Sequence, residues 1–258
     1  YGGTLKSTSV MELGAVTMKE TLKKAGVRPV TTEECINFGA DAIRADGTIE
    51  LESQYHDYDI NLTPVMVDQV IMGNVISAGQ GQNVTRQAMI MAGIPKETNA
   101  TTVNKLCASG MESVALAYQA IRSGDSEVVL AGGMENMSMV PYALPGARWG
   151  QRMGDGQLVD LLIYDGLFEK FYGYHMGITA ENIAEKYGIS RQEQDEIGAL
   201  SHKRAMLYFT QPSTRTFLSF MAACQILGIT CNEVRDPKTS SEIKRESHMD
   251  SIRMFSSY

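Results

Sequence analysis

The sequence predicts an α/β fold with a mostly parallel sheet flanked by helices. Short strand-like apolar runs alternate with longer stripes at helical spacing between residues 67 and 131. Strands that alternate with helices imply parallel pairing through right-handed crossovers. The 258 residues allow one large α/β domain or two modest ones, and they are enough to bury a real core.

The first predicted helix covers residues 10–25. Ser9 and Glu12 have the spacing of a capping box, an apolar stripe follows, and Gly26 suits the carboxyl-terminal stop. Further elements follow in order: a half-buried strand over 67–72, a helix over 85–91, a strand near 101–104, a helix over 109–122 with Met111, Val114, Ala115, Tyr118 and Ile121 on one face, and a buried strand over 127–131.

The second half of the chain changes character. Residues 139–171 are rich in glycine, proline and aromatic residues, which predicts a long excursion rather than sheet. Helices are predicted again at 179–187 and at 191–206, the latter with Ser190 and Glu193 as a capping box. Beyond Tyr208 a short helix is predicted from Pro212 to near Gly228. We therefore expect a domain over residues 1–206 and an incomplete α/β tail over 207–258.

An acidic segment, residues 31–63, interrupts the first domain. It holds eight acidic residues and one basic residue, Arg44, so it accounts for the whole net charge of −7. The abrupt shift in composition predicts an insertion that forms a separate unit. Outside it the charges balance without clustering, which argues against a nucleic-acid-binding surface.

Composition excludes several classes of protein. Hydrophobic residues make up 43% and charged residues 21%, which excludes disordered and collagen-like chains. The longest apolar runs are too short to cross a membrane. Four cysteines without a CxxC pair argue against a disulfide scaffold or a zinc site and favour a reducing, cytoplasmic setting. The chain shows no signal peptide and opens without Met, so we expect a fragment.

Cys107 is the sharpest candidate for chemistry. It lies where the strand near 101–104 turns into the helix that follows, and Ala108, Ser109 and Gly110 after it are all small. A helix amino terminus favours a thiolate, and small neighbours leave room for a substrate. On spacing alone a lone cysteine is more often inert packing, so both interpretations stay open. The other three cysteines, Cys35, Cys224 and Cys231, fit inert packing.

Three ordered motifs point to one known family of enzymes. Val-Asn-Lys-Leu-Cys-Ala-Ser-Gly-Met at residues 103–111 is similar to the acylation-site motif of the thiolases. The resemblance continues at residues 131–138 (Ala-Gly-Gly-Met-Glu-Asn-Met-Ser) and 175–182 (His-Met-Gly-Ile-Thr-Ala-Glu-Asn). It covers roughly residues 1–29 and 65–206, and it implies one half of a thiolase-like layered fold.

The resemblance implies an activity and its site. Cys107 would take an acyl group from acyl-CoA, with the coenzyme A thioester as a substrate and no cofactor. His175 and Met176 correspond to positions that line the pantetheine tunnel of the family, and the excursion resembles a loop used for CoA contact and assembly. Half of such a fold leaves an apolar face uncovered, which predicts a homo-oligomer. Neither nucleic acid nor a membrane is expected as a partner.

The sequence also departs from the thiolase pattern. Thiolases carry an activating histidine in a Gly-His-Pro motif and an acid/base cysteine in a Cys-x-Gly motif, and this sequence contains neither motif. Activation by an adjacent base is what makes a thiol competent. We therefore expect slow acylation at best and no carbon–carbon bond chemistry.

The tail resembles a different enzyme. Pro-Ser-Thr-Arg-Thr at residues 212–216 is similar to the carbamoyl-phosphate motif of aspartate and ornithine carbamoyltransferases. The residues that would bind the phosphate are Ser213, Thr214, Arg215 and Thr216, with Ser240 and Lys244 resembling the later loop of that family. Phe217, Met221 and Arg245 depart from its usual residues. Two alternatives to a thiolase-like function follow: a carbamoyl-phosphate-binding chain, or a composite fragment without turnover.

Overall fold

The computed structural model of the chain describes residues 2–38, 50–199, 204–208 and 230–234. The chain divides into two compact units, residues 1–176 and 177–258. The described helices of the first unit are α1 (Val10–Lys24), α2 (Glu33–Phe38), α4 (Glu50–Tyr55), α5 (Val84–Met91) and α6 (Ser109–Ser123). Its described strands are β1 (Val27–Val30), β2 (Thr63–Met66), β3 (Gln69–Gly73), β4 (Asn99–Val103), β5 (Val129–Gly133), β6 (Tyr142–Ala143), β7 (Val159–Asp160), β8 (Phe168–Glu169) and β9 (Tyr174–His175).

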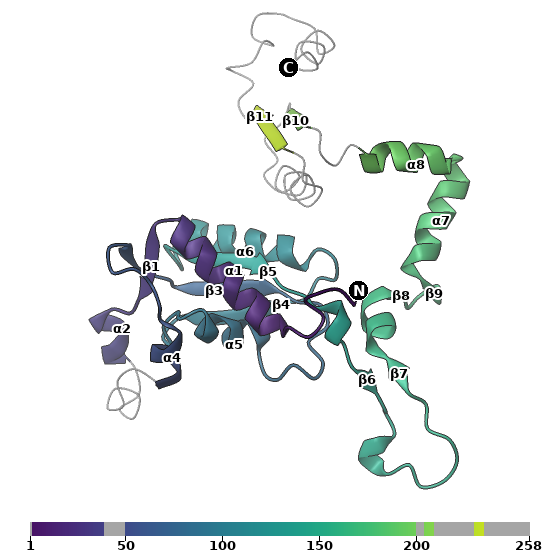
Figure 1. Cartoon of the computed structure of the whole chain (residues 1–258), viewed down its shortest axis with the longest axis horizontal. Coiled ribbons are helices and arrows are strands. Elements are labelled where there is room, and N and C mark those ends of the chain that lie inside the picture. The colour runs from purple at the N-terminus through teal and green to yellow at the C-terminus, as the bar shows by residue number, and fades with distance from the viewer. Residues whose placement is uncertain (1, 39–49, 200–203, 209–229, 235–258) are drawn as a thin grey trace, which may run out of the picture. The chain divides into compact units, whose positions relative to one another are not determined.

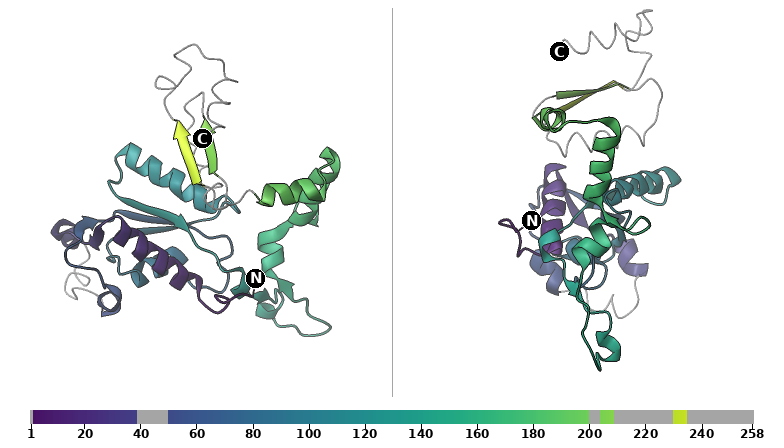
Figure 2. Two further views of the ribbon diagram at one scale, coloured as in Figure 1. Left: turned by 45° about the horizontal axis from the view of Figure 1, so that its top comes forward. Right: turned by 90° about the vertical axis from the view of Figure 1, so that its right-hand side faces the viewer.

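The centre of the first unit is a three-stranded parallel sheet in the order β4-β3-β5 (Figure 1). Helix α6 packs on β3 and β5, whereas α5 packs on β3 and β4 and α1 packs on α5. Figure 2 shows α6 on one side of the sheet and α1 and α5 on the other. The predicted α/β architecture with a parallel sheet and flanking helices is therefore confirmed.

Helix α1 begins and ends where the sequence predicts. The Ser9 backbone N–H donates to a Glu12 carboxylate oxygen at 2.8 Å, and the Glu12 N–H donates to the Ser9 hydroxyl at 3.2 Å. Gly26 follows the helix with φ of +73°, a left-handed conformation that costs a glycine little. The buried face of α1, which includes Val10, Met18 and Leu22, joins the main apolar core with α5 and the sheet.

Strand burial differs from the sequence-based expectation. The strand predicted as half-buried is β3, and four of its five residues are buried because it is the central strand with helices on both faces. The strand predicted as buried is β5, which lies at an edge of the sheet and is only partly buried. The order of the strands in the sheet decides which strand is buried between its neighbours. The apolar pattern of a single strand does not reveal that order.

Helix α6 turns its small residues toward the sheet. Ser109, Ser113 and Ala117 are buried, whereas the larger apolar residues remain between 37% and 48% exposed. We call that exposed set the α6 stripe: Met111, Val114, Tyr118 and Ile121. The helix lies so near to β3 and β5 that only small side chains fit between them, so the apolar stripe faces outward.

The described part of the acidic segment is packed into the first unit rather than standing apart. Strand β2 pairs with β1 in parallel, and α4 contacts α5. A Glu52 carboxylate oxygen accepts the Lys96 N–H at 3.1 Å, and the Tyr58 hydroxyl donates to the Ala92 carbonyl at 2.6 Å. The expected separate unit is therefore wrong for residues 50–63, because their polar groups bind the turn that follows α5.

The excursion over residues 139–171 contains little sheet, as predicted. Two antiparallel pairs, β6 with β7 and β8 with β9, have two residues in each strand. Between and beside them lie 3-10 turns η1 (Met137–Met139) and η2 (Ala147–Trp149) and the π-helix η3 (Leu162–Leu167).

The second unit differs from the prediction in one element. Helix α7 (Met176–Tyr187) begins at the boundary between the units, and α8 (Arg191–Gly198) has the predicted capping box of Ser190 and Glu193. The helix predicted over 191–206 is wrong at residues 204–206, because β10 (Arg204–Tyr208) is a strand paired in parallel with β11 (Thr230–Val234). Pairing with a distant segment overrides the local helical pattern.

Two sequence-based expectations for this half of the chain stay predictions. The short helix from Pro212 to near Gly228 lies outside the described residues. The domain boundary between residues 206 and 207 also stays a prediction. Within the part of the chain that the structure describes, none of the helices has both the length and the apolar character needed to span a membrane.

Candidate active site

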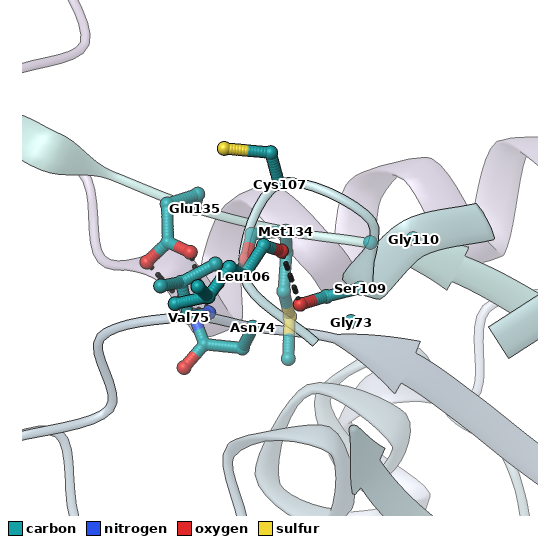
Figure 3. A pocket seen from close by; sticks show the side chains of 10 residues that line it. Gly73, Asn74, Val75, Leu106, Cys107, Ser109, Gly110, Met134 and Glu135 are labelled. Carbon is teal, nitrogen blue, oxygen red and sulfur yellow. Dashed lines mark hydrogen bonds between the residues drawn. The ribbon is translucent and has the colours of Figure 1, made fainter. Parts of the chain in front are cut away.

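A pocket of about 370 Å³ lies at the carboxyl ends of the three parallel strands (Figure 3). Its lining comes from the turns after β3, β4 and β5 and from the first turn of α6: Gly73, Asn74, Val75, Leu106, Cys107, Ser109, Gly110, Gly133, Met134 and Glu135. Ligands of open α/β sheets bind outside the carboxyl ends of the strands. The structure therefore brings Cys107 to the edge of the sheet where this class of fold places its sites.

Glycines allow the amino end of α6 to reach that edge. A Cβ atom on Gly73 would lie 2.4 Å from the carbonyl carbon of Ser109 and 2.5 Å from the Gly110 nitrogen. A Cβ atom on Gly133 would lie 3.3 Å from the Gly110 Cα. Backbone atoms cannot yield as a flexible side chain can, so a side chain at position 73 would push α6 and the Cys107 loop away from β3.

The loop before α6 is a tight hydrogen-bonded turn. The Lys105 N–H donates to the Ser109 hydroxyl at 2.8 Å, and that hydroxyl donates to the Leu106 carbonyl at 2.5 Å. The Ser109 N–H also donates to the Leu106 carbonyl, at 2.9 Å. Leu106 has φ of +51°, a left-handed conformation that is unusual for a residue with a side chain. The loop is therefore held in a strained shape directly before Cys107.

Cys107 is exposed and free, two residues before the first helical residue of α6. Its thiol points outward from the loop, away from Ser109 and Gly110 (Figure 3). The thiol is therefore accessible to a reactant that approaches the strand ends. The pocket lining in the described residues contains no histidine that could accept its proton.

Glu135 ties two of the strand-end turns together. Its carboxylate accepts the Val75 N–H at 2.6 Å, the Ile76 N–H at 3.3 Å and an amide proton of Asn74 at 3.1 Å. Burial raises the pKa of Glu135, and these three hydrogen bonds oppose that rise without cancelling it. The turn after β3 is thereby fixed to the turn after β5, and both border the pocket.

Asn74 completes that connection from the buried side. It is 1% exposed, and its amide also donates to the Met134 carbonyl at 3.0 Å. Sequence reasoning missed Asn74 and Glu135 as site residues. A signal for both was present, since polar residues one or two positions after a glycine at the ends of two parallel strands meet at one edge of the sheet.

Two other predicted site residues do not line this pocket. His175 is the last residue of β9 and Met176 the first of α7, and neither lines the Cys107 pocket. Their contact with a pantetheine arm stays a prediction. The predicted phosphate-binding set lies outside the described residues: Ser213, Thr214, Arg215, Thr216, Ser240 and Lys244. Among the described side chains, no three of the His, Cys, Asp or Glu type gather as metal ligands would.

The fold and the pocket define a parallel α/β domain that presents a cysteine at the strand ends, on the amino-terminal side of a helix. Residues 57–208 match the family model described as thiolase, N-terminal domain. That match covers more than half of the chain. The chain belongs to the thiolase family.

Curated relatives agree with this assignment. An acetyl-CoA acetyltransferase of Syntrophomonas wolfei is 44% identical over 207 residues, which is 80% of this chain and 43% of the relative. The Escherichia coli protein of that name is 43% identical over 206 residues, with the same shares of the two chains. One from Pseudomonas aeruginosa is 57% identical over 140 residues, 54% of this chain and 36% of the relative. The chain thus spans less than half the length of these relatives.

The end of the chain is similar to another family. Residues 178–258 match the model described as aspartate/ornithine carbamoyltransferase, carbamoyl-P binding domain. This match overlaps the thiolase match over residues 178–208 and lies within the second compact unit. Both resemblances recognised in the sequence are confirmed as similarities.

Proposed function

We propose that this chain accepts an acyl group from acyl-CoA on Cys107. The observation that carries the proposal is an exposed cysteine at a pocket on the strand ends of a thiolase-family domain. Curated relatives named acetyl-CoA acetyltransferase support acyl-CoA as the substrate class.

The chemistry is a thioester exchange. The Cys107 thiolate attacks the carbonyl carbon of the acyl thioester, the bond from that carbon to the CoA sulfur breaks, and CoA leaves as a thiolate that takes up the proton lost by Cys107. Because the sequence has neither a Gly-His-Pro nor a Cys-x-Gly motif, we expect the chain itself to acylate slowly and not to form or cleave carbon–carbon bonds.

Mass spectrometry tests the acylation directly. After incubation with acetyl-CoA, we expect a mass increase of one acetyl group that maps to the peptide containing Cys107. Cys107→Ser should abolish this increase, whereas Cys35→Ser, which removes another free cysteine, should leave it unchanged. Acetylation that survives in Cys107→Ser, or its absence from the parent chain, contradicts the proposal.

Two finer features of the site belong to the same proposal. His175 and Met176 would contact the pantetheine arm of CoA, which is supported by the match of residues 57–208 to the thiolase model. A nucleophilic thiol needs a reducing compartment to stay free, which favours the cytoplasm.

We further propose that the chain assembles with copies of itself. The α6 stripe is an exposed apolar face on the helix that follows the Cys107 loop, and Leu106 in that loop is 54% exposed. Closed two-fold dimers place the same patch of both subunits in contact, so one helix face can cover its own copy. Sedimentation velocity should show a dimer or a larger species, and a single monomer boundary contradicts this proposal.

A second candidate function is binding of carbamoyl phosphate by the tail. The match of residues 178–258 to the carbamoyl-P binding domain favours it. A phosphonate mimic of carbamoyl phosphate should then raise the melting temperature, because a ligand that binds only the folded state stabilises it. Arg215→Ala should remove that shift. An unchanged melting temperature in the parent chain would eliminate this candidate.

A further inference from the structure

Asn104 joins two turns at the edge of the pocket. Its Nδ2 donates to the Val75 carbonyl at 3.0 Å, and its Oδ1 accepts the Leu106 N–H at 3.0 Å. One side chain thus connects the turn after β3 to the loop that carries Cys107. Asparagine supplies a donor and an acceptor on separate atoms of one short side chain, whereas ionised aspartate lacks the donor and alanine lacks both.

Leu106 needs support to keep its conformation. Leu106 and Asn83 are the non-glycine residues with positive φ that the described part of the chain contains. A left-handed leucine is unfavourable because its Cβ crowds the backbone, so such a residue persists only where its surroundings impose it. Here Asn104 binds the N–H of Leu106, and Ser109 binds its carbonyl through both its N–H and its hydroxyl.

The conformation of Leu106 sets the direction of the next residue. Cys107 follows it directly, so a change of Leu106 to an ordinary conformation would turn the Cys107 side chain relative to the pocket. The turn after β3, to which Asn104 is bound, is itself fixed by the hydrogen bonds of Val75 and Ile76 to Glu135. Asn104 therefore connects the Cys107 loop to a turn that is held by hydrogen bonds from another strand end.

We propose that Asn104 is a positioning residue for acyl transfer: it holds Leu106 in the left-handed conformation and so keeps the Cys107 thiol at the rim of the pocket. The proposal rests on the proposed acylation of Cys107. Asn104 acts through Leu106 and has no contact with the transferred acyl group.

The test compares acyl transfer with the intrinsic reactivity of the thiol. In Asn104→Ala the rate constant for acetylation of Cys107 by acetyl-CoA should fall by about tenfold or more, because misplacement of a reacting atom is costly. The rate of alkylation of Cys107 by iodoacetamide should change by less than twofold, because the thiol is exposed. Asn104→Asp keeps the acceptor for Leu106 but loses the donor to Val75, so an intermediate rate is expected. A loss below twofold in Asn104→Ala overturns the proposal.

Asn83 supplies a matched control. It too has positive φ, and its amide accepts the Arg86 N–H at 3.2 Å and donates to the Ala100 carbonyl at 3.0 Å, outside the pocket lining. Asn83→Ala should leave the acetylation rate within twofold of the parent. A decrease as large as that in Asn104→Ala would show a general loss of structure and would overturn the positioning role.

A glycine at position 106 tests the route of the effect. Glycine adopts the left-handed conformation without support, so Asn104→Ala should cost less than threefold in a Leu106→Gly background. If Asn104→Ala lowers the acetylation rate as much in the Leu106→Gly background as in the parent, the effect does not act through Leu106 and the proposal is overturned.

NMR coupling constants and chemical shifts of Leu106 report its backbone conformation without any acyl transfer. A left-handed Leu106 in Asn104→Ala overturns the positioning role, whereas a parent chain that is not acetylated overturns the proposed function itself.

Discussion

Gly73→Ala should lower the free energy of unfolding by about 3 kcal/mol, because overpacking at a site without room is strongly destabilising. The added Cβ would lie 2.4 Å and 2.5 Å from backbone atoms of Ser109 and Gly110, and neither atom can move without α6. The Cys107 loop continues into that helix, so acetylation of Cys107 should fall with the stability. Urea denaturation measures the first effect and mass spectrometry the second.

Gly110→Ala is the control for this substitution. A Cβ atom at that position would meet its nearest neighbours, the Gly132 oxygen and the Gly133 Cα, at 3.9 Å, which is ordinary contact. Alanine is also a better helix residue than glycine, by about 1 kcal/mol in a helix interior. The free energy of unfolding should therefore stay the same or rise. An equal loss in both variants would show that close approach at Gly73 is not the cause.

Glu52→Gln should make the protein more resistant to urea at pH 8, by on the order of 1 kcal/mol, because an amide is less costly to bury than a charge. Glu52 is 6% exposed, and burial raises its pKa. A raised pKa in the folded state means that the contribution of Glu52 to stability is fully present below the ordinary carboxyl pKa of about 4.3 and is lost as pH rises through the folded value. The advantage of the variant should therefore shrink toward pH 4.

Glu12→Gln should lower the stability at pH 8, whereas Glu52→Gln should raise it. Hydrogen bonds from the hydroxyl and the N–H of Ser9 lower the pKa of Glu12. Its charge therefore stabilises the fold above the ordinary carboxyl pKa, and that contribution is lost as pH falls through the lowered value. Glu12→Gln should be less stable than the parent at pH 8 and equal to it in acid. If the stability of the two variants relative to the parent changed with pH in the same way, the pKa directions of both Glu52 and Glu12 would be contradicted.

Local features of the fold were predictable from the sequence because the interactions that create them span only a few residues. The capping box of Ser9 and Glu12 closes one turn, and Gly26 stops the helix by its own backbone preference. The place of Cys107 at a strand-to-helix turn is equally local, and the thiolase motif around it was recognised from nine consecutive residues.

Which face of helix α6 is buried could not be predicted from local sequence. The apolar face of α6 suggested packing, yet the helix packs through Ser109, Ser113 and Ala117. The reason lies at Gly73 on strand β3, because the absence of a side chain there allows the helix to lie close to the sheet. A pattern within one helix cannot show how near its neighbour lies.

By itself the sequence determined the α/β class, the first helix and its ends, and the family, and it made Cys107 the candidate nucleophile. Only the tertiary structure decided that β3 is central and β5 an edge, that the described end of the acidic segment packs beside α5, and that Glu135 binds the turn after β3. Glu135 and Val75 are 60 residues apart in the chain. Contacts over such separations depend on how the elements assemble, whereas caps, stops and motifs depend only on neighbours along the chain.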